Sequence, residues 1–323
     1  METVKAIVYN RYGPPDVLRK EEIDTPVPKD DEVLVRIRAA SVNPYDWHLV
    51  RGLPYLVRMS GIRKPKNTSV GVDLAGIIES VGHDVTQFQI GDEVFGLGAG
   101  SCAEFACSSI MQLAHKPSDI SFDAAAAVPV AAITALQGLQ SDGELQPGVK
   151  VLINGAAGGV GTFAVQIAKS FGAEVTGVCS TKNLDLVRSL GADRVIDYTT
   201  EDFTREGIRY DLILDTVGNH SVWAFRRALT PKGTLRLVGG GGGKLFGPLG
   251  LMLKALIVSP LVSQHFTLVG AKVTTERLLV LSALIESKQV TPVIDRTYKL
   301  EETAEALRYL ETGHARGKVV IVV

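Results

Sequence analysis

Cysteine is scarce in this 323-residue chain, which contains only three. Cys102, Cys107 and Cys179 are unevenly spaced and too few for a disulfide framework, so they favour a reducing compartment. No secretory or transit segment stands before the first strand pattern, which begins near Val4. We therefore expect a cytoplasmic protein.

An excess of charge of either sign is also missing. Lysine and arginine total 34, against 35 aspartates and glutamates, so the formal net charge is -1. Runs of basic residues are absent as well. This balance argues against nucleic acid as the main partner.

The chain lacks an uninterrupted apolar run that is long enough to cross a bilayer. The nearest candidate is residues 245–262, which contain Lys254 and are broken by two glycines and two prolines. A spanning helix needs about 20 apolar residues. We therefore expect this segment to be a pocket lid, a subunit interface or a core helix, and we expect no integral membrane segment.

The six histidines lack the spacings that metal binding or nucleophilic catalysis commonly uses. No His-x-x-x-His pair occurs. Five of them show no pairing with Ser, Cys or Asp at triad-like positions: His48, His115, His220, His265 and His314. Nucleophilic hydrolysis therefore has no support from the sequence.

The stretch that organises the chain runs from Lys150 to Phe171. Its apolar residues 151–153 predict a buried strand, and the apolar spacing over 160–171 predicts an amphipathic helix. Glycines between the two let backbone N–H groups approach a pyrophosphate, and the helix N-terminus adds its positive end. The predicted dinucleotide contacts are Ala156, Gly158, Gly159, Val160 and Gly161. Ala156 takes the first glycine position of the usual G-x-G-x-x-G pattern, and an ordinary loop is the alternative.

The end of the next predicted strand, 174–179, indicates which cofactor fits. NAD-selective folds place Asp or Glu there to bind the ribose 2′-hydroxyl, whereas this chain has Ser180, Thr181 and Lys182. Two hydroxyls and an ammonium suit a 2′-phosphate, so the sequence favours NADPH over NADH. Alternatively, Ser180 and Thr181 cap a helix that begins near Asn183.

The chain exceeds the length that one core supports, so we expect two domains. Residues 1 to about 122 contain short strands between prolines and glycines, which predicts a compact barrel-like β domain. The predicted strands are 6–9, 33–39, 74–81, 93–95 and 104–106. An alanine-rich helical segment follows over 123–139, with Ser121 as its N-cap.

From residue 149 the pattern alternates strand and helix, as a doubly wound parallel sheet requires. The predicted strands are 149–154, 174–179, 194–197, 211–215 and 233–238. Further on we expect helices over 275–287 and 302–310, and strands over 296–299 and 318–323. The five glycines 239–243 predict a mobile loop or one that lies near a phosphate.

Six short motifs carry a resemblance to a known family. They are Ser41–Trp47, Gly71–Gly76, Gly91–Gly96, Asn154–Gly161, Leu190–Asp193 and Gly313–Lys318. Together they resemble the zinc-independent quinone oxidoreductases of the medium-chain dehydrogenase/reductase superfamily, over essentially the whole chain. The resemblance implies an α/β protein, with a GroES-like β-rich catalytic domain (1–123 and 266–323) and a doubly wound Rossmann domain for NADPH (124–265). It also implies a homodimer.

The resemblance further implies chemistry without a metal. Catalytic zinc needs three protein ligands at an open tetrahedral site, but Asn43 and Val72 stand where zinc relatives carry cysteine and histidine. Without a metal to polarise it, the acceptor must be intrinsically electrophilic. Quinones and α,β-unsaturated ketones or aldehydes meet that requirement, and the family implies the same substrates. A zinc alcohol dehydrogenase and a non-catalytic NADPH-binding protein are the alternatives.

The resemblance implies two residues near the reacting atoms. Asn43 is the first candidate for lining the nicotinamide–substrate cleft, and a turn residue before Pro44 is its alternative role. Tyr55 is a candidate proton donor, although it stands three residues after Gly52, where the family has its tyrosine two residues after the matching glycine. Water is the other source of the proton.

Further cofactor contacts are implied in the second domain. They are Thr134, Tyr198, Val217, Gly218, Val238, Gly239 and Gly240. A hydrogen bond to its own helix backbone is the competing role for Thr134, and simple packing is the competing role for Tyr198. Lys318, near the C-terminus, is interpreted as a surface charge and is given no role.

Overall fold

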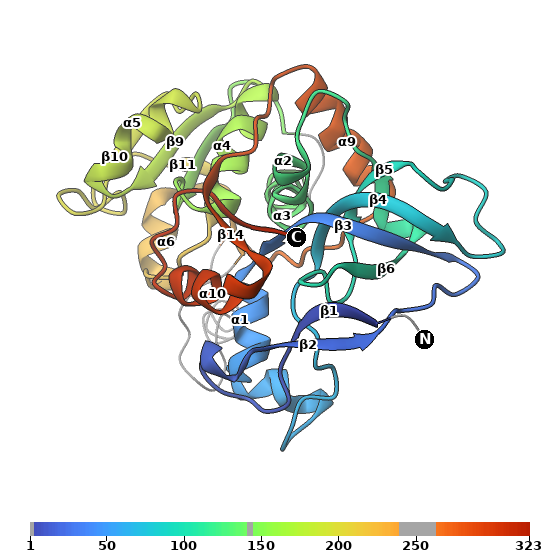
Figure 1. The fold of residues 1–323 in the computed structure, drawn as a ribbon. Coiled ribbons are helices and arrows are strands. Elements are labelled where there is room, and N and C mark those ends of the chain that lie inside the picture. The colour runs from blue at the N-terminus through green and yellow to red at the C-terminus, as the bar shows by residue number, and fades with distance from the viewer. Residues whose placement is uncertain (1–2, 141–144, 239–262) are drawn as a thin grey trace. The chain divides into compact units, whose positions relative to one another are not determined.

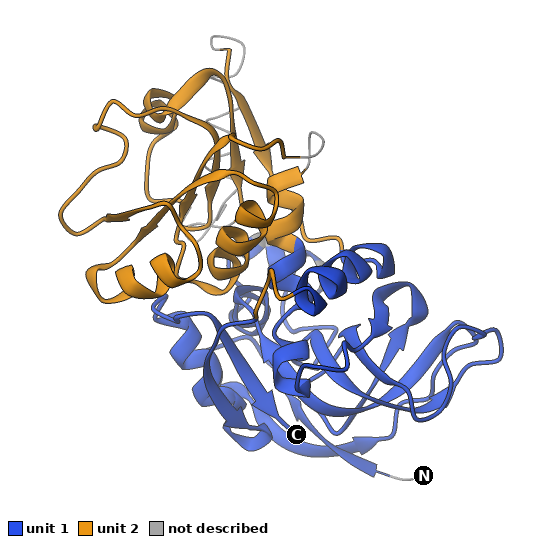
Figure 2. Ribbon diagram, turned by 90° about the horizontal axis from the view of Figure 1, so that it is seen from above, with its two compact units in different colours: residues 1–133, 273–287, 292–323 blue, residues 134–272, 288–291 orange. Residues whose placement is uncertain are grey.

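The computed structural model describes residues 3–140, 145–238 and 263–323 (Figure 1). They form two compact units, which Figure 2 colours separately. Unit 1 comprises residues 1–133, 273–287 and 292–323, and unit 2 comprises residues 134–272 and 288–291. The division falls inside one helix, α3 (Pro129–Gln140).

Unit 1 is built on a seven-stranded sheet and a separate two-stranded pair. Its strands are β1 (Thr3–Val8), β2 (Arg19–Asp24), β3 (Glu32–Val42), β4 (Asp73–Val81), β5 (Glu93–Leu97), β6 (Phe105–Ser109), β7 (Leu113–His115), β14 (Ile294–Lys299) and β15 (Lys318–Val322). The larger sheet has the order β14-β15-β3-β4-β5-β7, with β6 paired to β3, while β1 pairs with β2. Its helices are α1 (Pro44–Arg51), α2 (Phe122–Ala126), α9 (Thr275–Glu286) and α10 (Thr303–Glu311), with 3-10 turns η1 (Pro15–Val17), η2 (Tyr55–Ser60), η3 (Ile110–Gln112) and η6 (Leu300–Glu302).

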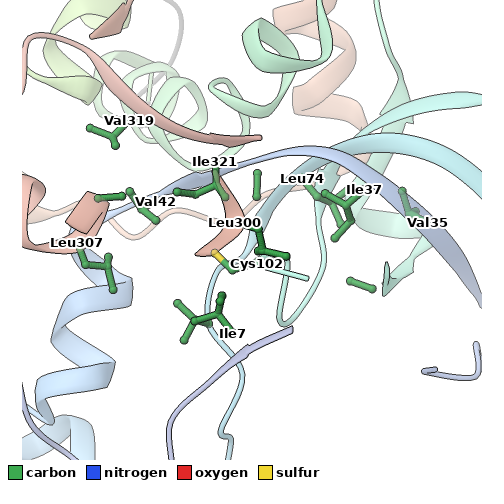
Figure 3. Packing of buried hydrophobic residues seen from close by; sticks show 14 of the residues in the cluster. Ile7, Val35, Ile37, Val42, Leu74, Cys102, Leu300, Leu307, Val319 and Ile321 are labelled. Atoms are coloured by element: carbon green, nitrogen blue, oxygen red, sulfur yellow. The ribbon is translucent and has the colours of Figure 1, made fainter. Parts of the chain in front are cut away.

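The longest strand, β3, shows why this sequence forms a sheet with one buried face. Val35 and Ile37 are buried, while Arg36 and Arg38, which alternate with them, are exposed. This alternation matches the two-residue period of a strand, so one face enters the core. Figure 3 shows the cluster that results, in which residues from both ends of the chain pack together.

The C-terminal tail completes unit 1. Strand β15 lies between β14 and β3, and Val319 pairs with Val42 in an antiparallel ladder. Helix α10 buries Ala306 and Leu307 on one face, as an amphipathic helix does when it covers a core. The sheet begun near the N-terminus is therefore finished by the last residues of the chain.

Unit 2 contains a six-stranded sheet in which every neighbouring pair is parallel. Its strands are β8 (Lys150–Asn154), β9 (Glu174–Cys179), β10 (Arg194–Asp197), β11 (Tyr210–Asp215), β12 (Leu229–Leu237) and β13 (His265–Leu268), in the order β10-β9-β8-β11-β12-β13. The helices described with them are α4 (Gly159–Ser170), α5 (Leu184–Ser189) and α6 (Val222–Ala228), with the turn η4 (Thr181–Asn183). This is the strand order of a doubly wound nucleotide-binding sheet.

The structure confirms every predicted strand of both units, with bounds that differ by a few residues. Strands β2, β7 and β13 were not predicted. β2 is almost wholly exposed and lacks an apolar alternation, and β7 has only three residues. The helix predicted over 123–139 is two helices, because α2 ends at Ala126 and Pro129 begins α3. Ser121 caps α2 as predicted, since its Oγ accepts the N–H of Ala124 at 3.2 Å.

Two predicted features lie outside the described residues. They are the apolar segment 245–262 and the glycine loop 239–243. Across the stretches that the structure does describe, no helix combines the length and apolar character needed to span a bilayer.

The role of the tail in the core of unit 1 can be tested by a matched pair of substitutions. Leu307→Ala should lower the free energy of unfolding by about 2–5 kcal/mol, because Leu307 is fully buried. Leu279→Ala on α9 removes the same atoms from a side chain that is 54% exposed, and it should change stability little. The measurement is urea unfolding followed by Trp47 fluorescence in a Trp223→Phe background. Equal losses in the two variants would show that α10 does not stabilise this core.

Candidate functional site

The turn after β8 owes its shape to two glycines. Gly155 has a φ of 87°, and a Cβ there would lie 2.2 Å from the Oγ1 of Thr216. A Cβ on Gly161 would lie 2.1 Å from the carbonyl oxygen of Gly155, so α4 packs directly against the turn. Ala156 is fully buried, and its N–H donates to the carbonyl of Val178 at 3.0 Å. Ala156 therefore packs inside the sheet, and its N–H is not available to a ligand.

The first turn of α4 offers backbone donors. Gly158 is the N-cap, and Gly159, Val160 and Gly161 are the first three helical residues. Such N–H groups have no partner within a helix, and no acceptor for these three occurs among the described residues. A Cβ on Gly158 would meet nothing closer than 3.4 Å, so the space beside the turn is open. Free donors, open space and the positive end of the helix dipole together suit a pyrophosphate.

This turn lies where the strand order of the sheet reverses. The chain proceeds from β8 through β9 and β10 on one side, and through β11, β12 and β13 on the other. Sheets of this kind bind ligands at the carboxyl ends of the strands beside such a reversal. Asn154, which ends β8, donates to Asp215 at 2.8 Å and to Asn219 at 2.9 Å, both at oxygen Oδ1. The ends of β8 and β11 are therefore tied together at the predicted binding edge.

Asp215 organises the loop that follows β11. It is fully buried, and desolvation raises the pKa of its carboxyl. Its oxygens accept the N–H of Val217 at 3.2 Å and that of Gly218 at 3.1 Å. These two N–H groups are therefore engaged inside the loop, whereas the Val217 side chain, 40% exposed, is available for contact with a ligand.

The ends of β9 and β10 meet through a carboxylate that the sequence analysis did not consider. Thr181 Oγ1 donates to Asp197 Oδ2 at 2.5 Å, and Asp197 also accepts the N–H and the hydroxyl of Thr199. The bond from Thr181 is the main reason that the pKa of Asp197 is lowered. Because the Thr181 proton is used in this way, Thr181 cannot donate it to a phosphate. The spacing of residues in the sequence could not reveal this hydrogen bond, because Asp197 belongs to the neighbouring strand.

The side chains of three residues at this edge are available for contact with a phosphate group or an adenine ring. Ser180 Oγ accepts from Asn183 at 3.2 Å, which leaves its own proton to donate. The Lys182 side chain is exposed, and Tyr198 is 53% exposed directly after β10. The structure thus brings Ser180, Lys182 and Tyr198 to the carboxyl ends of β9 and β10, where the sequence places the adenosine phosphate.

Unit 1 holds a second group of polar residues, which is buried. Asn43 Nδ2 donates to Asp73 Oδ2 at 2.9 Å, and Lys318 Nζ donates to Asn43 Oδ1 at 2.5 Å. Asp73 also accepts the Ser41 hydroxyl at 2.8 Å and the Val130 N–H at 3.0 Å. The carboxylate is fully buried and hydrogen-bonded on both oxygens, as a buried charge must be.

The interpretation of Lys318 as a surface charge was wrong. Its side chain is only 4% exposed, and its ammonium lies 3.4 Å from Asp73 Oδ2. The antiparallel pairing of β15 with β3 places it there, since Val319 stands opposite Val42. The sequence did contain a signal for this pairing. Asp73 and Lys318 carry opposite charges next to the apolar residues of a strand, and such charges need partners when they are buried.

Asp46, in the first turn of α1, adjoins this cluster. Its Oδ2 accepts the backbone N–H of Asn43 at 2.7 Å, and Gly71 donates a second N–H. Desolvation raises the pKa of Asp46 to about 7; the charge of Asp73 adds to this shift and that of Lys318 opposes it. The Asp46 carboxyl therefore holds its proton to a higher pH than an exposed aspartate does.

A cavity of about 150 Å³ lies beside Asp46 within unit 1. Its lining includes Tyr9, Tyr45 and Val72. Burial raises the pKa of Tyr9 to about 12, so its phenol stays protonated, whereas Tyr45 is 54% exposed. The cavity therefore places a carboxyl group and the Tyr45 hydroxyl, which are groups that can exchange a proton with a bound molecule, beside the Tyr9 phenol.

The remaining predicted site residues lie in different surroundings. Tyr55 begins η2 and is 52% exposed, and its ring contacts the guanidinium of Arg58 at 5.1 Å. Thr134 is buried in α3. Val238 is half-buried, and its N–H donates to the carbonyl of Asp215 at 2.9 Å. Gly239 and Gly240 lie outside the described residues.

Comparison with known proteins agrees with this geometry. The family model for the alcohol dehydrogenase GroES-like domain matches residues 29–125, and the zinc-binding dehydrogenase model matches residues 190–321. The chain is 35% identical to 2-methylene-furan-3-one reductase of Solanum lycopersicum, covering 98% of this chain and 79% of the relative. It is 33% identical to mitochondrial NAD(P)H oxidoreductase RTN4IP1 of Mus musculus, covering 98% and 88%. The quinone oxidoreductase structure from Coxiella burnetii superposes with a TM-score of 0.88 at 30% identity, over the full length of both chains.

A GroES-like unit joined to a six-stranded parallel sheet with a glycine turn defines a medium-chain dehydrogenase/reductase. Within that superfamily, the chain belongs to the zinc-independent quinone oxidoreductase family. The resemblance identified from the six motifs is thereby confirmed. In the part of the chain that the structure describes, no three His, Cys, Asp or Glu side chains converge to hold a metal ion.

The glycine turn predicts different outcomes for two alanine substitutions. Gly161→Ala should destabilise unit 2 by about 1–3 kcal/mol, because its Cβ would overlap the turn backbone. Gly158→Ala should keep the wild-type stability but weaken binding of a nicotinamide dinucleotide, since its Cβ enters the open space beside the donors. Thermal unfolding and cofactor titration by fluorescence check the two effects. Unchanged cofactor binding in Gly158→Ala would contradict this location of the pyrophosphate.

The shifted pKa of Asp46 predicts how stability depends on pH. The folded state keeps the proton up to about pH 7, whereas the unfolded chain releases it near the ordinary aspartate pKa of 3.8. The protonated carboxyl therefore favours folding at low pH, and that contribution is lost as pH rises from about 4 to 7. Asp46→Asn removes this titration. The free energy of unfolding of the wild type, minus that of Asp46→Asn, should fall across this range in urea titrations, and a difference independent of pH would contradict the assignment.

Proposed function

We propose that this protein is an NADPH-dependent, metal-free oxidoreductase that transfers hydride to quinones or to the activated C=C bond of α,β-unsaturated carbonyl compounds. The observation that carries the proposal is the set of free N–H donors at the start of α4, at the strand reversal of unit 2. Relatives support the substrate class. One is NADPH-dependent alkenal/one oxidoreductase of Arabidopsis thaliana, 35% identical over 98% of this chain and 79% of that relative.

The residues of the glycine turn fit the cofactor. The N–H groups of Gly159, Val160 and Gly161 can bind its pyrophosphate, and the open space beside Gly158 lets it approach. When bound, the reduced nicotinamide supplies a hydride to the acceptor. The bond between Asn154 and Asp215 keeps the strand ends together, so that the binding edge is preorganised.

The acceptor needs a partner for the charge that develops on its oxygen. In a quinone or an enone this charge spreads over a conjugated oxygen, so that hydrogen-bond donors can stabilise it without a metal. Asn43 is our candidate donor, because its amide keeps one Nδ2–H beyond the bond to Asp73. Asp46 and Tyr45, which line the cavity in unit 1, are candidates for proton exchange, in addition to Tyr55 and water.

The preference for NADPH is supported by the residues after β9. Ser180 has a hydroxyl proton to donate, and the ammonium of Lys182 is exposed. The hydrogen bonds from Thr181 and Thr199 keep Asp197 ionised, so its charge opposes a phosphate, and the preference rests on Ser180 and Lys182. These groups favour a 2′-phosphate over a 2′-hydroxyl. The homodimer and the cytoplasmic location stay predictions from the sequence.

The reaction is tested by following NADPH oxidation with a panel of quinones, enones and simple aldehydes. We expect turnover with quinones or enones and none with simple aldehydes. Turnover restricted to simple aldehydes or alcohols, together with one tightly bound zinc ion per chain, would support a zinc alcohol dehydrogenase. Tight NADPH binding without any turnover would support a binding protein.

Lys182 provides the test of cofactor choice. Its charge-assisted bond to a phosphate is worth about 1.5–3 kcal/mol. Lys182→Ala should therefore weaken NADPH about 10- to 100-fold and leave NADH nearly unchanged, as measured by the dissociation constants. Arg188→Ala is the control, since it removes an exposed cation of α5 that pairs with Asp185. Equal losses of NADPH and NADH in Lys182→Ala would refute the assignment.

A further inference from the structure

Lys318 occupies a position that is unusual for a lysine near a chain terminus. Its ammonium is buried and meets three oxygens: Asn43 Oδ1 at 2.5 Å, the Val42 carbonyl at 3.4 Å and Asp73 Oδ2 at 3.4 Å. The backbone specifies this position. Gly317 has a φ of 114°, and a Cβ there would lie 2.4 Å from the carbonyl oxygen of Val293, so only glycine fits at this position. The Lys318 N–H donates to the same carbonyl at 2.8 Å. The chain therefore delivers a cation to the polar cluster from the first residue of β15.

The charges on either side of Asn43 determine which way its amide faces. The ammonium of Lys318 binds the carbonyl oxygen, and the carboxylate of Asp73 accepts one amide proton. A rotation of the amide by 180° would place N–H against the ammonium and oxygen against the carboxylate. Both contacts would then be repulsive in a site that excludes water. The bound ammonium also polarises the amide, which strengthens the remaining Nδ2–H as a donor.

We propose that Lys318 is a positioning residue, which orients the Asn43 amide so that its second Nδ2–H is offered to an electron-rich oxygen of the bound ligand. This inference rests on the proposed function, because the ligand oxygen belongs to the hydride acceptor or to the nicotinamide. Lys318 itself touches neither in this scheme. Its contribution is the fixed direction and the polarisation of a neighbouring donor.

The direct test is chemical rescue of Lys318→Ala. The variant should lose about 10- to 100-fold in kcat, because the Nδ2–H of Asn43 is then no longer aligned with the ligand oxygen and the rate depends on that alignment. Methylammonium chloride should restore turnover in a saturable manner, since the cation can enter the space that the side chain leaves. Sodium chloride at the same ionic strength and methanol at the same concentration should not. Restoration by methanol would show that Lys318 only fills space, and absence of rescue would overturn the proposal.

Lys116→Ala is the matched control. Lys116 is the other lysine with a comparably buried side chain among the described salt bridges, 5% exposed, and it pairs with Glu93 at 3.1 Å. It also bonds to the carbonyls of Pro117 and Ile120, within unit 1 but in no contact with Asn43. Its loss should lower the thermal unfolding temperature, while kcat does not respond to methylammonium. A rescue of both variants would mean that the cation acts generally rather than at the Asn43 cluster.

A double variant keeps the test valid if Lys318→Ala does not fold. Asp73→Asn with Lys318→Met removes both charges, so that neither is left buried alone. It should fold, show the same loss in kcat and be insensitive to methylammonium. In a ¹⁵N spectrum, the two Nδ2 protons of Asn43 should differ less in chemical shift than in the wild type, because the two opposite charges that separate their shifts are gone. Wild-type kcat in the double variant, or failure of that variant to fold, would overturn the proposal.

The two levels of inference can be separated in one series of measurements. If the wild type turns over no quinone or enone, the proposed function fails, whatever Lys318 does. If the wild type is active and the rescue fails, the function stands and only the positioning role is wrong.

Discussion

The pairing of β15 with β3 is the constraint on which unit 1 depends. It inserts the last strand of the chain between β14 and the longest strand of the sheet. The same ladder places Lys318 beside Asn43. The neighbouring ladder, between β3 and β4, brings Asp73 to the same cluster by pairing it with Ser41. A buried carboxylate is strongly destabilising unless it is paired and hydrogen-bonded. One strand therefore closes the hydrophobic core and also neutralises the charge inside it.

Unit 2 depends on a constraint of a different kind, which is the close approach of backbone to backbone. The absence of a Cβ at Gly161 lets α4 touch the turn, and Gly155 supplies a conformation that other residues rarely adopt. Asn154 and Asp215 then secure the strand ends on either side. Among the described residues, the groups left available at this edge include the N–H donors of α4 and the side chains of Ser180 and Lys182. In the proposed function, these groups are the ones that would bind the dinucleotide.

Local patterns were sufficient to predict much of this architecture. The strands predicted over 174–179 and 194–197 coincide with β9 and β10, because a buried parallel strand and the turn after it are specified by neighbouring residues. The glycine turn could be located for the same reason. Strand β2 could not be found, since nearly every residue in it is polar and exposed and its place is fixed only by pairing with β1.

Two decisive contacts that the sequence did not reveal join residues from different strands or turns of a sheet. Lys318 reaches Asn43 across 275 positions, and Thr181 reaches Asp197 across 16. Neither pairing leaves a periodic signal, because each follows from the order of strands in a sheet. Ala156 shows the converse case: its place in the glycine pattern suggested a ligand contact, while its N–H bonds to Val178 of the adjacent strand.

The late position of β15 in the chain has a consequence for biosynthesis. Unit 2 is formed almost wholly by one continuous stretch, residues 134–272, whereas unit 1 needs both the first 133 residues and the final strand. Proteins emerge from the ribosome N-terminus first, and domains fold as units. The part of β3 that pairs with β15, residues 39–42, therefore lacks its partner until residues 319–322 have been synthesised and have left the ribosome. During that interval a chaperone or an equivalent strand from another nascent chain has access to the same edge.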